Sequence, residues 1–202
     1  MYHAVFIDQD GVILGARSDG AEGCEAPQFL PGALDALAQL VASELCVVVM
    51  VGQPHTDRRT VPAQMAERAH RYIVEAIGGG EEGRVDYVYW DADCAGERVA
   101  CREPGAELLR SAARELGVDL SQSYLIGDAA LDVRVGRLAG CRDRYLVLTG
   151  RGRQELARCW LRGERGFHVA FDLKAAADAI LLQEQSAVRQ PVTALLRGMA
   201  SR

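Results

Sequence analysis

Lysine is almost missing from this sequence: of its 23 lysine and arginine residues, only Lys174 is a lysine. The chain also lacks a surplus of basic charge, since its formal net charge is -5 and its pI is near 5.4. Proteins that bind nucleic acid or an anionic membrane surface through charge need a basic face. The composition therefore argues against both kinds of partner.

Long apolar runs and a leader segment are also missing. The longest apolar runs fall far short of the roughly 20 residues that a membrane-spanning helix needs. The first predicted strand begins almost at Met1, so we expect no signal peptide. The six cysteines are scattered, several of them in apolar surroundings, which is typical of reduced thiols. We therefore expect a cytoplasmic protein with no membrane partner.

Short apolar runs alternate with longer segments of helical periodicity along the chain. Runs typical of strands cover residues 4–8, 45–52, 85–91, 123–128, 144–150 and 167–172. Helical patterns cover residues 31–43, 61–78, 105–117, 129–140, 154–162 and 173–185. This alternation, with near-continuous apolar strands, predicts a doubly wound, Rossmann-like α/β fold whose parallel sheet is covered by helices on both faces.

The end of the chain differs from this pattern. We predict one α/β domain over residues 1–183 and a C-terminal tail over residues 184–202, which contains Pro191. The stretch "VTALLRGM" fits a short amphipathic helix that packs on the body or joins subunits into a homo-oligomer. A frayed terminus is the alternative.

Carboxylates stand at the ends of two predicted strands. Asp8 and Asp10 end the first, Asp128 ends the strand over 123–128, and Asp132 follows one helical turn later. If these strands are neighbours, Asp8 and Asp128 converge at the sheet edge where open α/β sheets place their chemistry. Mg²⁺ relieves the repulsion, because it binds a few carboxylates together with water and phosphate oxygens. Each motif taken alone has a structural interpretation: Asp-x-Asp-Gly is a common turn sequence, and Gly127-Asp128 fits a helix N-cap.

The converging carboxylates indicate attack on a phosphoryl group. Asp8 would be the nucleophile that forms an aspartyl-phosphate, and Asp10 the acid/base that protonates the leaving oxygen and then activates water. The sequence therefore predicts Mg²⁺-dependent phosphoryl chemistry on a small phosphorylated metabolite.

Four segments together resemble a known family. They are "FIDQDGVI", "VVVMVGQ", "CREPGAELLRSAARELG" and "SYLIGDAALDVRVGRLAGC". In order and spacing they are similar to the haloacid dehalogenase (HAD) superfamily of phosphohydrolases, within the branch of heptose 1,7-bisphosphate and histidinol-phosphate phosphatases. The resemblance covers residues 4 to about 183. It implies a sugar phosphate as substrate, and it leaves no room for a large cap domain.

The resemblance also implies roles for individual residues. Asp8 matches the nucleophile, Asp10 the acid/base that also gives a backbone carbonyl to Mg²⁺, and Asp128 the metal-binding carboxylate. Asp132 matches a second acidic position with a structural or metal-supporting role. The implied positions for binding the substrate phosphate are Gly52, Gln53 and Arg102.

The chain departs from the family where the family holds phosphate. Val51 stands where the family has a threonine or serine, and Glu103 where it has a lysine. Ala129 stands where the family often has a second lysine. Loss of one preorganised donor to a developing anion costs about 10²–10³ in rate. Compensation is expected from the arginines nearest by motif position, Arg58, Arg59 and Arg102, and the missing hydroxyl from Thr56 or Thr60 in the loop after the second strand.

A structural zinc, frequent in this branch, is not expected here. The segment "WDADCAGERVACREP" has only Cys94 and Cys101 and no histidine. Two thiolates do not complete the tetrahedral set that a structural zinc requires.

Two functions remain open at this point. The first is a Mg²⁺-dependent phosphatase, favoured because Asp8, Asp10 and Asp128 are all present. The second is a catalytically impaired relative that binds a ligand or a protein partner, favoured by Val51 and Glu103. A dinucleotide-binding enzyme is a weaker third option, because no Gly-x-Gly-x-x-Gly follows the first strand.

Overall fold

Six parallel strands form a single sheet in the order β3-β2-β1-β4-β5-β6. The computed structural model describes residues 2–15, 28–52, 71–76, 85–90 and 104–199. The strands are β1 (Ala4–Asp8), β2 (Cys46–Gly52), β3 (Val85–Trp90), β4 (Tyr124–Gly127), β5 (Asp143–Val147) and β6 (His168–Ala170). This architecture confirms the predicted doubly wound α/β fold.

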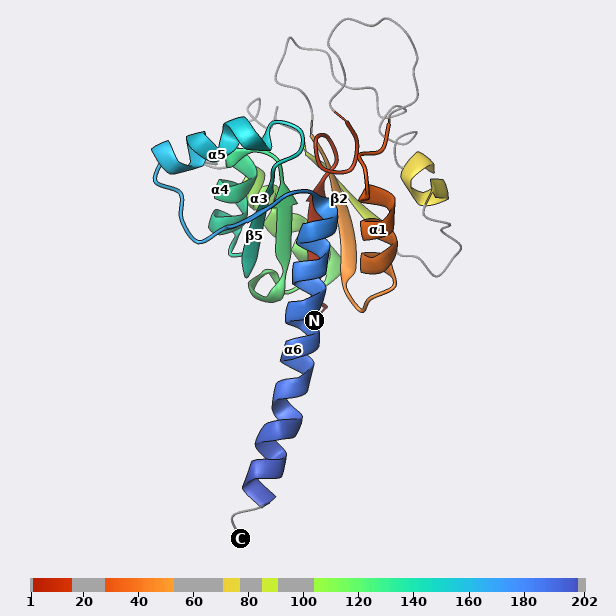
Figure 1. Cartoon of the computed structure of the whole chain (residues 1–202), viewed down its shortest axis with the longest axis vertical. Coiled ribbons are helices and arrows are strands. Elements are labelled where there is room, and N and C mark those ends of the chain that lie inside the picture. Colours follow the sequence, from red (N-terminus) through yellow and green to blue (C-terminus); the bar gives the residue numbers. More distant parts are fainter. Residues whose placement is uncertain (1, 16–27, 53–70, 77–84, 91–103, 200–202) are drawn as a thin grey trace, which may run out of the picture.

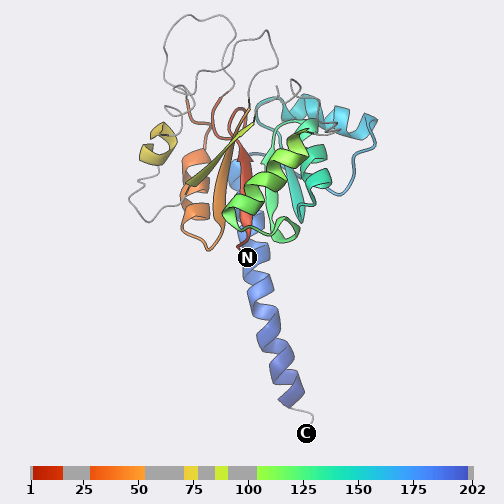
Figure 2. The same ribbon diagram turned by 180° about the vertical axis from the view of Figure 1, so that it is seen from behind.

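Helices lie on both faces of the sheet (Figures 1 and 2). They are α1 (Ala33–Val41), α3 (Pro104–Leu116), α4 (Ala130–Ala139), α5 (Gly152–Leu161) and α6 (Leu173–Met199), with a 3₁₀ turn at Leu120–Gln122 and helical residues at 71–76. Among the described residues none builds a second domain over the sheet, which agrees with the expected absence of a large cap. None of the described helices combines the length and apolarity needed to cross a bilayer.

Side chains alternate along β1 between two core clusters, one on each face of the sheet. Val5 and Ile7 face the layer of α1 and α6, whereas Ala4 and Phe6 face the layer of α3 and α4. All four side chains are fully buried. Burial of a large apolar side chain contributes about 1.5–3 kcal/mol. The central strand is therefore held from both sides, and its carboxyl end has a defined position.

Helix α6 crosses the predicted boundary between domain and tail. It continues as one helix to Met199 and extends beyond the sheet (Figure 1). Glu184, the first residue of the predicted tail, lies 3.0 Å from the His3 ring and accepts hydrogen bonds from Tyr124 Oη and Arg142 Nη1. The division at residue 183 and an oligomer contact through the tail both stay predictions.

Candidate active site

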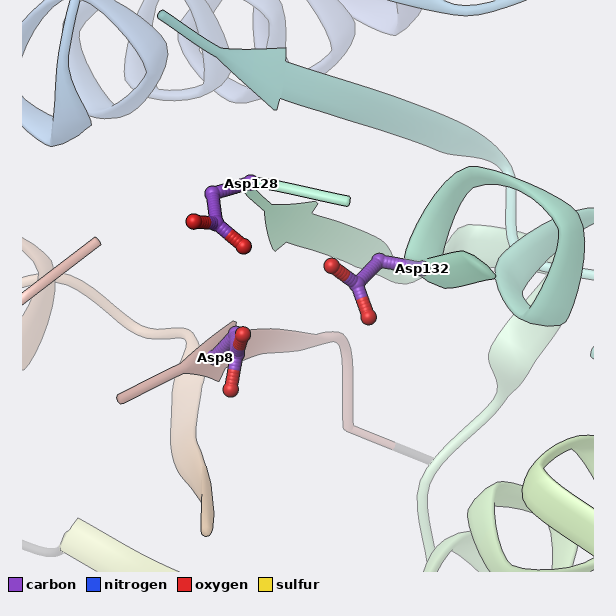
Figure 3. Close-up of side chains that lie close together, drawn as sticks. All are labelled: Asp8, Asp128 and Asp132. Atoms are coloured by element: carbon purple, nitrogen blue, oxygen red, sulfur yellow. The ribbon is translucent and has the colours of Figure 1, made fainter. Parts of the chain in front are cut away.

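Three carboxylates meet at the carboxyl ends of two neighbouring strands. Asp8 is the last residue of β1, Asp128 directly follows β4, and Asp132 lies in the first turn of α4. Because β1 pairs with β4, these elements bring the three side chains together (Figure 3). One oxygen from each lies within 4.8 Å of the others. We call Asp8, Asp128 and Asp132 the carboxylate cluster.

The local sequence makes room for this approach. A Cβ atom on Gly127 would lie 2.3 Å from Asp132 Oδ2, so only glycine fits at the end of β4. Asp132 Oδ2 accepts the backbone N–H of Ala129 at 2.9 Å. The buried Glu155 of α5 accepts the backbone N–H of Ala130 at 3.1 Å. The start of α4, and with it Asp132, is therefore held by hydrogen bonds.

The electrostatics of the cluster are unfavourable without a cation. Burial raises the pKa of Asp8 well above its usual range, and the charges of Asp132, Asp128 and Asp10 raise it further. Burial also raises the pKa of Asp132 to about 7, although the hydrogen bond from Ala129 opposes the shift. Carboxylates held close together are a donor set that suits a hard divalent cation. The described residues thus fit Mg²⁺.

The electrostatic cost predicts a pH-dependent stability difference. In the unfolded chain Asp132 titrates near pH 4, but in the folded protein its pKa is about 7. Between about pH 4 and pH 7 the folded state therefore binds a proton on Asp132 that the unfolded chain has lost. The stability of the folded protein falls as the pH rises through this range. In EDTA, we expect the stability gained by Asp132→Asn over wild type to be larger at pH 7.5 than at pH 5.

Thermal unfolding at both pH values measures this difference. In the wild type, added Mg²⁺ should raise the melting temperature more at pH 7.5, because a deprotonated carboxylate binds the cation better. A gain from Asp132→Asn that is equal at both pH values would contradict the electrostatic account.

A tight turn follows Asp8. The backbone N–H of Gly11 donates to the carbonyl of Leu14 at 2.7 Å, and those of Ile13 and Leu14 donate to the Gln9 carbonyl. Gly11 has a φ of 80°, in the left-handed region that favours glycine. A Cβ atom there would lie 2.2 Å from Asp128 Oδ2. The turn thus packs directly against the cluster.

A second loop, residues 148–151 between β5 and α5, closes on the same carboxylate. Thr149 Oγ1 donates to the Gly11 carbonyl at 2.6 Å. The backbone N–H of Arg151 donates to Asp128 Oδ2 at 2.7 Å, and its Nη2 atom lies 3.3 Å from Asp128 Oδ1. We call residues 148–151 the β5–α5 loop. It gives Asp128 both a backbone and a side-chain partner.

The structure brings together some of the predicted site residues. Asp8, Asp128 and Asp132 meet in the cluster, whereas Asp10 is outside this set and accepts a hydrogen bond from Gln9 Nε2 at 3.3 Å. The acid/base and metal roles of Asp10 stay predictions. Gly52 is the last residue of β2, next to β1. Gln53, Arg102 and Glu103 lie outside the described residues, as do the cysteines of the zinc prediction and the other compensating candidates.

Sequence reasoning missed the β5–α5 loop. The apolar pattern predicted a strand over 144–150, but β5 ends at Val147. Gly150 has a φ of 54°, and the loop turns back toward Gly11 instead of extending the sheet. The signal was present in "TGRG", since glycines after a parallel strand are typical of a functional loop.

The chain resembles known phosphatases over most of its length. It is 30% identical to D-glycero-beta-D-manno-heptose-1,7-bisphosphate 7-phosphatase of Bordetella bronchiseptica, with 88% of this chain and 97% of that protein aligned. The corresponding enzyme of Pseudomonas aeruginosa is 29% identical over the same shares of the two chains. A family model described as HAD-hydrolase-like matches residues 100–176.

Solved structures agree with these sequence matches. The B. bronchiseptica D,D-heptose 1,7-bisphosphate phosphatase, solved with magnesium and phosphate, superposes with a TM-score of 0.69, covering 90% of this chain and 99% of that one at 30% identity. The Burkholderia thailandensis phosphatase gives a TM-score of 0.65 at 27% identity, covering 89% and 98%. The chain therefore belongs to the HAD-like hydrolase family.

Proposed function

We propose that this protein is a Mg²⁺-dependent phosphatase that hydrolyses a small phosphorylated sugar. The observation that carries the proposal is the convergence of Asp8 with Asp128 and Asp132 at the ends of paired strands. The substrate class follows from similarity to heptose 1,7-bisphosphate phosphatases.

In the proposed reaction Asp8 is the nucleophile. Its carboxylate oxygen attacks phosphorus, the bond from phosphorus to the leaving oxygen breaks, and Asp10 gives that oxygen a proton. Asp10 then takes a proton from water, whose oxygen attacks the aspartyl-phosphate and releases inorganic phosphate and free Asp8. Asp8 and Asp128 would hold Mg²⁺ with Asp10 or Asp132. When bound, Mg²⁺ supplies positive charge that offsets the carboxylates and the phosphoryl oxygens.

Phosphate release tests this proposal. We expect turnover on at least one member of a panel of sugar phosphates and p-nitrophenyl phosphate in Mg²⁺, and none in EDTA. The Asp8→Asn protein is the blank for contaminating phosphatases. Absence of turnover above this blank on every substrate would reject the phosphatase proposal.

A second function is favoured by two substitutions at the expected phosphate-binding positions. Glu103 places an anion where the family has a lysine, and Val51 stands where the family has the hydroxyl of a threonine or serine. A protein that only binds a ligand or a partner does not need these groups. If no substrate of the panel turns over, this binding function is favoured. A titration with Mg²⁺ alone then shows whether the carboxylate cluster binds the cation.

A further inference from the structure

The proposed phosphatase site lacks a positive charge that the sequence motifs would normally supply. The carboxylate cluster carries three acidic groups, and a substrate phosphate adds up to about two negative charges. One divalent cation does not balance this total. Glu103 and Ala129 occupy positions where the family has lysine, so a compensating cation has to come from an arginine, and within the described part of the chain Arg151 lies beside the cluster.

Arg151 lies at the cluster. Its Nη2 atom is 3.3 Å from Asp128 Oδ1, and the Arg151 side chain is 65% exposed whereas that of Asp128 is 2% exposed. The guanidinium therefore reaches from a buried carboxylate to solvent. Burial lowers the pKa of Arg151, but Asp128, Asp132 and Asp8 together outweigh this and raise it. The guanidinium thus lies in the field of all three carboxylates.

The backbone of Arg151 is fixed independently of its side chain. Its N–H donates to Asp128 Oδ2 at 2.7 Å, and the preceding Thr149 is tied to the Gly11 carbonyl. A Cβ atom on Gly150 would lie 2.6 Å from Gly11 Cα, so the loop lies directly on the turn that follows Asp8. Truncation of the side chain leaves these backbone contacts in place. The orientation of Asp128 and the charge of the guanidinium can therefore be tested separately.

We propose that the Arg151 guanidinium binds the phosphate group of the substrate, in place of the lysines that this chain lacks. The inference rests on the proposed phosphatase function and names a residue of that site. The side chain that pairs with Asp128 exchanges this carboxylate for phosphoryl oxygens. The planar fork of arginine matches two oxygens of a phosphate with parallel N–H donors, as it matches a carboxylate.

Arg151→Ala is expected to change the affinity for two ions differently. Loss of charge-assisted hydrogen bonds should weaken the binding of inorganic phosphate to the Mg²⁺-loaded protein by about 10- to 100-fold. Mg²⁺ affinity without phosphate should stay the same or rise, because a positive charge beside the carboxylates is removed. A purely structural role, in which the side chain orients Asp128, predicts the reverse: weaker Mg²⁺ binding.

Isothermal titration calorimetry with Mg²⁺ alone, and with inorganic phosphate at saturating Mg²⁺, measures both affinities. Arg153→Ala is the matched control, because Arg153 is an exposed arginine two residues further on, in α5. It should change neither affinity, and Arg151→Lys should keep part of the phosphate affinity. The Michaelis constant of Arg151→Ala should rise together with the dissociation constant for phosphate.

The inference and the proposed function fail in different ways. Phosphate affinity that is unchanged in Arg151→Ala, or a loss of Mg²⁺ affinity in this variant, would overturn the inference even if the wild type hydrolyses its substrate. Wild-type protein that binds Mg²⁺ but hydrolyses nothing on the panel would instead overturn the phosphatase function. A phosphate affinity that depends on Arg151 in such a protein would still support the inference.

Discussion

Asp8→Asn is expected to abolish Mg²⁺-dependent phosphate release and, in the metal-free protein, to raise the melting temperature. Loss of the proposed nucleophile removes the proposed covalent route, so we expect turnover to fall by about 10⁴-fold or more. Stability should change in the opposite direction. Burial and three neighbouring carboxylates raise the pKa of Asp8, so its charged form is costly in the folded state.

An asparagine has nearly the same shape without the charge. We expect a gain of about 1 kcal/mol at pH 7.5, which corresponds to roughly 2–4 °C for a chain of this size. Thermal unfolding in EDTA measures the gain, and phosphate release measures the loss. Asp35→Asn is the matched control, because Asp35 is exposed in the first turn of α1 and should affect neither quantity strongly. With the EDTA-treated wild type as the blank, Mg²⁺-dependent turnover in Asp8→Asn that equals that of the wild type, or a lower melting temperature, would refute the assignment of Asp8.

Gly150→Ala is expected to disrupt the site. It should also lower the stability more than an alanine placed at another glycine with a left-handed backbone. The added Cβ would lie 2.2 Å from Asp128 Oδ2 and 2.6 Å from Gly11 Cα. The left-handed backbone costs roughly 1–2 kcal/mol for a residue with a side chain, and the overlap adds about 1–3 kcal/mol. Because Asp128 or the β5–α5 loop must move, we expect Mg²⁺-dependent turnover to fall by about 10²-fold or more.

Gly117→Ala separates these two contributions. Gly117 has a φ of 68°, but a Cβ atom there would meet nothing within 4 Å. This variant should have the cost of the backbone conformation alone, and it should retain full turnover per folded molecule. Denaturant unfolding and calorimetric titration with Mg²⁺ distinguish the two proteins. If both variants lose equal stability and both bind Mg²⁺ normally, the close approach at Gly150 has no role.

The sheet could be predicted from the sequence because its signals are local. The central strands are short apolar runs, and β1 and β2 fall where their runs predict them. The strand over 144–150 was predicted too long, because an apolar pattern does not show that Thr149 turns back to bond Gly11. Tertiary contacts, and not propensity, end β5 at Val147.

The carboxylate cluster could be predicted only in part. Strand ends brought Asp8 and Asp128 together as expected, since β1 and β4 are neighbours. In the structure Asp132 joins these two carboxylates, whereas the acid/base and metal roles of Asp10 stay predictions. The spacing of residues predicts whether a residue lies on a turn or a helix, but the direction of its side chain depends on packing. Here the Asp132 side chain occupies the space that a Cβ atom on Gly127 would fill. Arg151 was missed for the same reason.

The bond between Thr149 and Gly11 joins residues 138 positions apart in the chain. Contacts between such distant segments form late in folding, because the entropy of closing a long loop has to be overcome first. In the nascent chain, Asp8 is also synthesised long before Asp128 and Asp132. We therefore expect any capture of a divalent cation by the three carboxylates to follow the pairing of β1 with β4, and not to guide the formation of the first strands.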